Sequence, residues 1–272
     1  MADAAPSAPD SEYLSTLEKG LRVLTAFSRD CPQMTLSEVA RVTQLSPAVA
    51  RRCLLTLTEL GYVGKVDGVF SLRPAVLELS RPFTESFDID NLIRPSLQRL
   101  RDETGDSASF ALLSGSDVLY LSHVSTYRVI RLQASAGTRF PALATSLGRA
   151  ILSVMPPGDV DAFLFKYPLK QRTEHTLIDA SALREAIQRA RHQGYAMVSD
   201  ELDYGITSIA APIVMPGRGP VGAVNSSAAT TRIDVNSFAD SRLPSLLAVR
   251  DSLTAELSRS PELVRAIQTA GY

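Results

Sequence analysis

Two adjacent arginines, Arg51 and Arg52, lie in the middle of a segment whose spacing predicts a helix from residue 47 to 60. At 100° per residue, this helix would bury one face and present Arg52 and Ala48 on the opposite one. Arg51 and Val49 fall on the two flanks. Guanidinium groups on a helix with small outer residues can bind guanine edges or phosphates in the major groove of DNA. These residue types and their spacing therefore indicate contact with nucleic acid.

Helix-capping signals predict the elements that would position these side chains. The stretch T-L-S-E, from Thr35 to Glu38, forms a capping box and begins a helix of about two turns. Ser46 followed by Pro47 begins the longer helix, because serine is a good N-cap and proline fits the first helical position. A short helix, a tight turn and a longer helix make a helix-turn-helix.

Two further elements complete this unit. Leu17, Leu21 and Leu24 follow helical spacing and predict a first helix from residue 14 to 28. After Gly61, two short apolar runs flank a D-G pair, which is typical of a β-hairpin turn. We therefore predict a winged helix-turn-helix over residues 13–80.

We expect the hydroxyls of Thr35 and Ser46, together with Lys65 on the hairpin, to contact the DNA backbone. Three helices and a hairpin also occur in packing units that never bind nucleic acid, and at this stage that alternative stays open.

Composition excludes several classes of protein. The net charge is -1, so DNA binding would need a local cluster of cations, and residues 13–84 carry nine Lys/Arg against six Asp/Glu. Residues 1–12 are typical of a disordered tail and lack the pattern of a secretory signal. No apolar run is long enough to cross a bilayer, and two cysteines form no metal-ligand or disulfide pattern. We expect a cytoplasmic protein with no cofactor, no metal and no membrane contact.

The remainder of the chain predicts a linker and a mixed α/β domain. Residues 81–105 should form a linker helix, with Ile93, Leu97 and Leu100 on one stripe. Residues 106–260 should form one antiparallel sheet with helices, and residues 261–272 a C-terminal tail. The predicted strands are 107–113, 118–124, 129–135, 206–215 and 220–227, and the predicted helices are 146–155, 159–167, 179–193 and 236–258.

Several motifs occur in a specific order along the chain: S-T-L-E-K-G-L-R-V-L, T-L-S-E-V-A-R, A-R-R-C-L-L-T-L, G-T-R-F-P-A-L-A-T-S-L-G-R-A-I-L, Q-G-Y-A, G-I-T-S-I-A-A-P-I and V-G-A-V-N-S-S. Over about residues 14–258 the chain resembles the IclR family of bacterial transcription regulators. It is most similar to the branch that governs protocatechuate, p-hydroxybenzoate and β-ketoadipate catabolism. The resemblance implies a winged helix-turn-helix, a linker helix and a GAF-like effector-binding domain.

The resemblance also implies partners. These would be double-stranded DNA with a palindromic operator, a small organic acid as effector, and further copies of the chain in a homodimer or a dimer of dimers. RNA polymerase is a further candidate partner.

In this family the effector lies between the sheet and the helix that follows G-T-R-F-P-A. Thr145 and Ser146 lie where this helix begins here, so free amides and the helix dipole would favour a carboxylate. Arg139 and Arg131 are candidate counter-ions. The positions that match the family's pocket are Leu132, Phe140, Ser146, Leu147, Ser199, Ser208, Asn225 and Ser227. Taken singly, each could equally be an ordinary cap, core or strand-end residue.

Two alternatives to a regulator stay open. The three histidines lack metal-ligand spacing, and G-x-S-x-G, H-E-x-x-H, P-loop and G-x-G-x-x-G motifs are absent from the sequence. The first alternative is nonetheless a small-molecule-acting enzyme of GAF-like fold with an accessory N-terminal domain. The second is a protein-interaction adaptor. Saturable, salt-dependent binding to the protein's own upstream DNA would separate a regulator from both.

Overall fold

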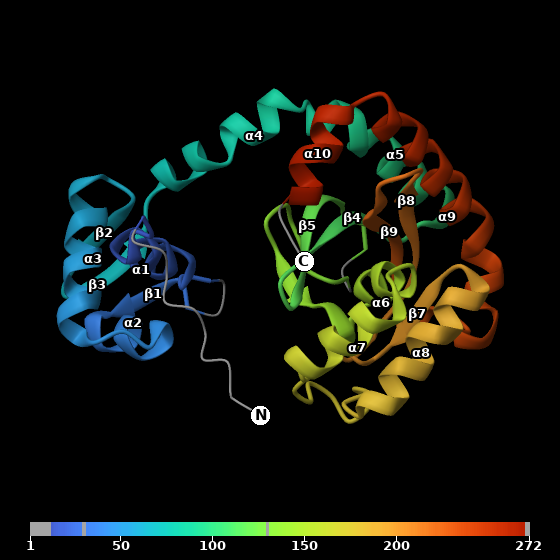
Figure 1. Ribbon diagram of the computed structural model, residues 1–272, viewed down its shortest axis with the longest axis horizontal. Helices are drawn as coiled ribbons and strands as arrows, with labels where there is room; N and C mark the ends of the chain where they lie inside the picture. Colours follow the sequence, from blue (N-terminus) through green and yellow to red (C-terminus); the bar gives the residue numbers. More distant parts are fainter. Residues whose placement is uncertain (1–11, 29–30, 129–130, 270–272) are drawn as a thin grey trace. The chain divides into compact units, whose positions relative to one another are not determined.

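The computed structural model describes residues 12–28, 31–128 and 131–269, and it divides the chain into two units between Phe83 and Thr84 (Figure 1). The predicted tail at residues 1–12, apart from Glu12, lies outside the described residues.

The N-terminal unit has the predicted elements of a winged helix-turn-helix. Its helices are α1 (Ser15–Thr25), α2 (Leu36–Thr43) and α3 (Pro47–Glu59), followed by a 3-10 helix, η1 (Pro74–Leu79). Its antiparallel sheet has the order β1-β3-β2, with β1 (Gln33–Thr35), β2 (Val63–Val66) and β3 (Val69–Leu72). Strand β1 was not predicted from the sequence. It is short and borders the capping box, whose own signal points to a helix.

The capping box of α2 forms as predicted. The Glu38 amide donates to Thr35 Oγ1 at 3.4 Å, and the Thr35 amide donates to Glu38 Oε2 at 2.7 Å. The hydrogen bond from the Thr35 amide is the main reason why the pKa of Glu38 lies below its ordinary value, and the hydrogen bond from the Thr35 hydroxyl lowers this pKa further. Asp67 and Gly68 both adopt positive φ in the hairpin turn, which matches the D-G signal.

The core of this unit confirms the predicted inner face of α3 but corrects α1. Leu24 of α1 is buried, whereas Leu17 and Leu21 are 60% and 52% exposed. The side of α1 that packs on α3 is the one that carries Val23 and Leu24. Spacing alone identified an apolar stripe on α1 but not which side of the helix the core covers.

The predicted single linker helix is instead two helices, α4 (Arg81–Ser86) and α5 (Ile89–Thr104). They are separated at Asp88, which has a left-handed backbone with φ of +46°. Aspartate tolerates this conformation better than most residues because its short polar side chain can hydrogen-bond locally, and here it accepts from the Asn91 amide. The apolar stripe of α5 is buried as predicted, and Gly105 ends the helix.

The C-terminal unit is built on one six-stranded antiparallel sheet with the order β6-β5-β4-β9-β8-β7. Its strands are β4 (Ser107–Ser114), β5 (Asp117–Val124), β6 (Arg139–Pro141), β7 (Ala196–Ser199), β8 (Ile206–Met215) and β9 (Gly219–Ala229). Residues 131–135 form no strand, contrary to the prediction for 129–135, whose first two residues lie outside the described ones. The edge strands β6 and β7 were not predicted, because three or four residues carry little periodic signal.

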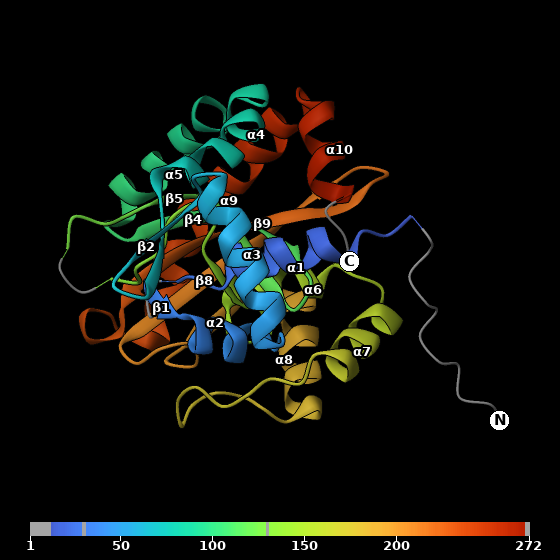
Figure 2. The same cartoon turned by 90° about the vertical axis from the view of Figure 1, so that its left-hand side faces the viewer.

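Helices cover both faces of this sheet (Figures 1 and 2). One face packs against α6 (Ser146–Ser153), with η2 (Ala142–Ala144), α7 (Pro157–Lys166) and α8 (Ala180–Gln193) beside it. The opposite face packs against α5 and α9 (Val235–Ser258), which is preceded by η3 (Thr230–Arg232). The first of these faces, called the α6 face below, carries the candidate effector site.

The chain does not end in a structureless tail after α9. Residues 261–269 form a further helix, α10 (Pro261–Thr269), with Leu263, Val264 and Ile267 buried. The segment is too short and too mixed in composition for its spacing to have predicted a helix, but α9 and β9 provide the apolar surface that stabilises it.

Candidate nucleic-acid interface and effector site

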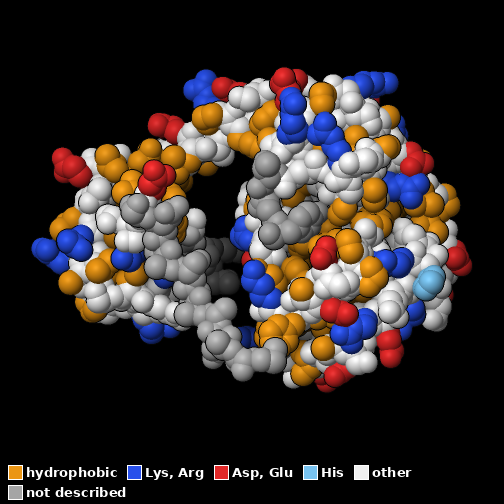
Figure 3. All heavy atoms as spheres, viewed as in Figure 1, with side chains coloured by type: hydrophobic (Ala, Val, Ile, Leu, Met, Phe, Trp, Pro, Cys, Tyr) orange, Lys and Arg blue, Asp and Glu red, His pale blue; other side chains and the backbone are white. Residues whose placement is uncertain are grey.

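The outer face of α3 carries the residues predicted to contact DNA. Ala50, Cys53, Leu54 and Leu57 are buried, and Ala48, Arg51 and Arg52 are exposed. Figure 3 shows Lys and Arg side chains gathered at the outer edge of the N-terminal unit. Val49, predicted on a flank of this helix, is half-buried against the core of the unit, so only part of its side chain is available to a partner.

The three residues expected to contact the DNA backbone are exposed, but two of them also act as helix caps. Ser46 Oγ accepts from the Val49 amide at 3.4 Å, and Thr35 Oγ1 belongs to the capping box of α2. Lys65 lies on β2, with its ammonium 5.5 Å from the centre of the Phe70 ring. A phosphate contact by Ser46 or Thr35 would therefore share the hydroxyl with the cap.

The N-terminus of α6 is capped by Thr145 and not by Ser146. Thr145 Oγ1 accepts from the Gly148 amide at 3.0 Å and also donates to the carbonyl of Ala142, so this hydroxyl is already engaged. Ser146 is the first helical residue, and its hydroxyl lies 2.9 Å from that of Ser208 on β8. The amides of Ser146 and Leu147 precede the amide of Arg149, which donates to the Thr145 carbonyl in the first backbone hydrogen bond of the helix. This end of α6 therefore presents hydrogen-bond donors.

Two buried features fix α6 in place. A Cβ at Gly148 would lie 2.2 Å from the carbonyl oxygen of Ala142, so only glycine allows this close approach. Arg149 and Glu201 form a bidentate pair with N–O distances of 2.7 and 2.6 Å, and they are only 2% and 7% exposed. Sequence reasoning did not single out this pair, although Arg149 lies in the quoted S-L-G-R-A run.

A row of cross-strand neighbours continues the site along the α6 face of the sheet. Asn225 on β9 is paired with Ala210 on β8 and with Ser109 on β4, and Ser109 is paired with His123 on β5. His123 Nδ1 lies 2.9 Å from Ser109 Oγ, and its Nε2 lies 3.0 Å from the hydroxyl of Ser125. Burial, helped by nearby arginine charges, lowers the pKa of His123 to about 4. The imidazole is therefore neutral at pH 7.

Asn225 is the unusual member of this row. The residue is 2% exposed, and its side-chain oxygen Oδ1 has no hydrogen-bond partner among the described residues. It faces α6, because its neighbour Ala210 packs in the core beneath that helix. A buried acceptor without a partner is costly and calls for an explanation such as a ligand.

The structure brings several of the predicted effector residues together. Ser208 and Ser227 are direct cross-strand neighbours, and Phe140 packs edge-on against Tyr120 with ring centres 5.5 Å apart. We call the following residues the α6-face cluster: Ser109, Tyr120, His123, Phe140, Ser146, Leu147, Ser208, Asn225 and Ser227.

Two predicted effector residues, Ser199 and Arg139, face away from this cluster, and a third, Leu132, lies in a loop. Ser199 is paired with Thr207, and their hydroxyls are 2.7 Å apart, so it faces away from Ser208 across the sheet. Arg139 is exposed and bound to Asp117 and Ser114 on the other side of β6 from Phe140. Leu132 is half-buried in the loop before β6. Position in the family pattern did not reveal which face of a strand each side chain occupies.

A β-bulge places His123 on the same face of β5 as Tyr120. Tyr120 and His123 are three residues apart, and simple alternation would place them on opposite faces of β5. The register shifts between Phe110 and Ala111, which leaves Leu121 without a direct partner. The extra residue returns His123 to the face of Tyr120, and the two ring centres lie 6.3 Å apart.

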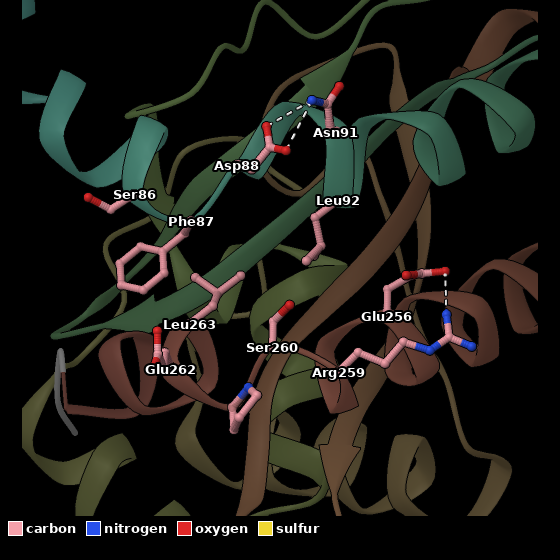
Figure 4. A pocket seen from close by; sticks show the side chains of 11 residues that line it. Ser86, Phe87, Asp88, Asn91, Leu92, Glu256, Arg259, Ser260, Glu262 and Leu263 are labelled. Atoms are coloured by element: carbon pink, nitrogen blue, oxygen red, sulfur yellow. Dashed lines mark hydrogen bonds and ion pairs between the residues drawn. The ribbon is translucent and has the colours of Figure 1, made fainter.

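Two clefts open elsewhere on the C-terminal unit, and neither includes a residue of the α6-face cluster. The first has a volume of about 600 Å³ and lies where α5 begins and α10 begins (Figure 4). Within it, Asn91 donates to Asp88 and Arg259 to Glu256, so these charged groups already have partners. The second, of about 570 Å³, lies beside the end of α7 and is lined by Ser116, Asp117, Pro141, Leu143, Lys166, Tyr167, Pro168, Leu169, Lys170, Gln171 and Arg172.

Among the described residues, no group of His, Cys, Asp and Glu side chains is arranged to hold a metal ion. No helix formed by these residues is both long enough and apolar enough to cross a membrane.

Comparisons with known proteins match both units of the chain. Residues 16–67 match the model of the IclR helix-turn-helix domain, and residues 82–254 match that of the bacterial transcriptional regulator IclR C-terminal domain. The Pca regulon regulatory protein of Pseudomonas putida is 34% identical, with 91% of this chain and 86% of that protein covered. The p-hydroxybenzoate hydroxylase transcriptional activator of Acinetobacter baylyi is 30% identical, with 86% and 89% covered.

A solved structure agrees in fold. It is an IclR homolog from Microbacterium hydrocarbonoxydans complexed with 4-hydroxybenzoate, with a TM-score of 0.73, 23% identity, and coverage of 90% of this chain and 99% of that one. The winged helix-turn-helix and the GAF-like α/β domain expected from the sequence are thus confirmed as the fold class.

Proposed function

Because this chain belongs to the IclR family of bacterial transcriptional regulators, we propose that it binds a palindromic operator and that a small aromatic carboxylic acid modulates this binding to control catabolic genes. Membership makes it a DNA-binding regulator and not an enzyme. Action on chromosomal DNA gives the cytoplasm as its expected location.

The proposal that the protein binds DNA rests on the residues exposed on the outer face of α3. A capped helix that exposes Ala48, Arg51 and Arg52 can enter the major groove, where arginine binds guanine in a bidentate manner. The wing residue Lys65 would neutralise a flanking phosphate.

The effector half is supported by the chemistry of the α6-face cluster and by what the relatives' names state. The amides and hydroxyls at the start of α6 suit a carboxylate, and Tyr120 and Phe140 suit an aromatic ring. One relative is named as a regulator of p-hydroxybenzoate hydroxylase, and the Microbacterium homolog holds 4-hydroxybenzoate.

Effector binding would act by favouring one of two arrangements of the DNA-binding units in the assembled protein. Helix α5 packs against both the sheet and α9, and the helix before it, α4, contains the boundary between the units. A shift at the effector site can therefore reach the linker, with a coupling typically of about 1–3 kcal/mol.

Operator binding tests the proposal. We expect the full-length protein to bind its own upstream DNA with saturation, and the affinity to fall linearly with salt on a log–log scale. Arg52→Ala should weaken operator binding by about 1–3 kcal/mol if the guanidinium contacts a guanine. Arg189→Ala is the matched control, because this arginine is exposed on α8 and lies outside the proposed interface. Equal operator affinity of both variants and wild type would remove α3 from the interface.

A further inference from the structure

The second of the two clefts, called the α7 cleft below, has two walls. One wall is the segment of residues 166–172, which begins at the last residue of α7. The other is formed by Ser116 and Asp117, where β5 begins, and by Pro141 and Leu143 at the start of η2. Its volume of about 570 Å³ lies within the roughly 300–1,000 Å³ of typical small-molecule sites. None of these residues belongs to the α6-face cluster.

The segment wall of the α7 cleft carries three cations that have no acidic partner. Lys166, Lys170 and Arg172 are exposed, and none of them forms an ion pair with another described residue. Arg172 donates from Nε to a backbone carbonyl at 3.0 Å, and no described residue accepts from its two terminal nitrogens. The acid in the lining, Asp117, is already bound by Arg139. The cleft therefore carries an excess of positive charge.

The rest of the lining of the α7 cleft is largely apolar. Tyr167 and Leu169 are half-buried and pack against the core of the C-terminal unit, to which the buried Leu143 belongs. The ammonium group of Lys166 lies 5.1 Å from the centre of the Tyr167 ring, so a cation and an aromatic surface are adjacent. A flat ring can lie against such a surface while charged groups on its edge reach the cations.

We propose that the α7 cleft is a second ligand site, separate from the proposed effector site, that binds a small aromatic acid with two or more carboxylates and restrains α6 when it is occupied. One carboxylate can bind the guanidinium of Arg172 in a bidentate manner. Lys166 lies at the opposite end of the same wall, so a second carboxylate on the ring is needed to neutralise it. The site uses none of the residues proposed to bind DNA or the effector.

Both walls of the α7 cleft are connected to α6. In η2, the carbonyl of Ala142 lies directly against Gly148 of α6. On the other wall, the Arg172 amide donates to Thr176 Oγ1 at 3.1 Å. That hydroxyl donates to the carbonyl of Glu201, whose carboxylate is paired with an arginine on α6. A ligand that contacts both walls should therefore restrict the movement of α6.

Titration calorimetry of the full-length protein with benzene-1,3,5-tricarboxylate (trimesate) tests the site. The paired substitution Lys166→Gln and Lys170→Gln should weaken trimesate binding at least about tenfold, because it removes two of the three cations. Citrate carries three carboxylates but no ring. It should bind to wild type at least about fivefold more weakly than trimesate, because it cannot use the apolar lining.

A second pair of substitutions controls for the change in net charge. Arg189→Gln with Arg218→Gln removes two exposed cations of the same unit that lie outside the α7 cleft. This pair should keep the trimesate affinity within about twofold of wild type, because salt screens distant charges. Both pairs replace exposed side chains, so both variants should unfold at the wild-type melting temperature in the absence of ligand.

Hydrogen exchange measures the effect of the occupied cleft on α6. Saturating trimesate should slow the exchange of backbone amides in Ser146–Ser153 at least about threefold in wild type, because a restrained helix opens less often. The lysine pair variant at the same trimesate concentration should show no such slowing.

Each part of the proposal has an outcome that contradicts it. Absence of trimesate binding, equal trimesate affinity of wild type and the lysine pair variant, or an equal loss in the arginine pair variant would overturn the site. Citrate bound as tightly as trimesate would overturn the aromatic ligand class, and unchanged exchange in α6 would overturn the restraint on this helix. Operator binding is measured separately, so none of these results decides whether the protein binds DNA.

Discussion

Two buried acidic side chains of the C-terminal unit, Glu201 and Asp106, are paired with arginines on distant segments, and Asn225 is a contrast to them. Arg149 reaches Glu201, and the buried carboxylate of Asp106 binds Arg242 at 2.8 Å. Each of these contacts satisfies a charge that water no longer reaches, so each holds two elements in one arrangement. In the part of the chain that the structure describes, Asn225 Oδ1 has no such partner, and a ligand that donated to this oxygen would gain the free energy of the missing hydrogen bond.

His123 should make the stability of the folded protein depend on pH. Its folded pKa is about 4, below the ordinary value of 6.5, so between these values the unfolded chain binds a proton that the folded protein does not. The stabilising contribution is complete above pH 6.5 and is lost as the pH falls towards 4. The loss should be about 2 kcal/mol, because a half-buried ring keeps part of its solvation.

Thermal unfolding of wild type and His123→Gln between pH 7.5 and 4 measures this contribution. The variant, which cannot gain the proton, should lose less stability than wild type over that range. His175→Gln serves as the control because His175 is exposed. Parallel pH profiles for wild type and His123→Gln would show that the neutral imidazole is not stabilised by folding.

At the scale of elements, the position of α6 depends on Gly148, because a side-chain methyl group at this residue would clash with η2. The helix approaches η2 so closely that Gly148 is the only residue that fits against the Ala142 carbonyl. This contact sets where the first turn of α6, and hence Ser146, meets the sheet. The proposed effector site therefore depends on the close contact between Gly148 and Ala142, although Gly148 itself lies two residues after Ser146.

Gly148→Ala should destabilise the protein by about 2–4 kcal/mol, because the added methyl group forces the backbone of η2 or α6 to move. Gly158→Ala provides a matched control on α7, where an added Cβ meets nothing within 4 Å. That variant should be neutral or stabilising by up to about 1 kcal/mol, since alanine favours the helix. Chemical denaturation of the two variants beside wild type gives both values. Similar stability of the two variants would refute the steric argument.

At the scale of the whole molecule, α1 carries an apolar stripe that no described residue covers. Leu14, Leu17 and Leu21 follow helical spacing and are 70%, 60% and 52% exposed. Three exposed leucines in line on one helix are typical of a surface that is buried in an oligomer. From this stripe we propose that the protein dimerises through its DNA-binding units, an arrangement that would present two recognition helices to the two half-sites of a palindrome.

The paired substitution Leu17→Glu and Leu21→Glu should convert the proposed dimer into a monomer without unfolding the chain, because both side chains already face solvent in the single chain. Light scattering after size-exclusion chromatography measures the molar mass, and operator affinity should fall with it. Thr16→Glu adds a charge beside the stripe on an exposed position and should leave the dimer intact. A dimer of unchanged stability in the paired variant would place the interface elsewhere.

The sequence by itself determined the DNA-reading unit almost completely. The capping box of α2, the Ser-Pro start of α3 and the D-G turn are local signals, and each specifies its element through contacts within a few residues. The apolar stripe of α5 and Gly105, which ends this helix, were likewise predicted from local spacing. Local rules were sufficient where local contacts decide the structure.

The tertiary structure decided what depends on contacts between distant segments. A β-bulge placed His123 with Tyr120, strand register separated Ser199 from Ser208, and packing on α9 and β9 made α10 a helix. A shift of one residue in register turns a side chain to the opposite face of a sheet, and such a shift leaves no mark in composition or periodicity. For that reason the effector site, unlike the recognition helix, had to be assembled from the fold.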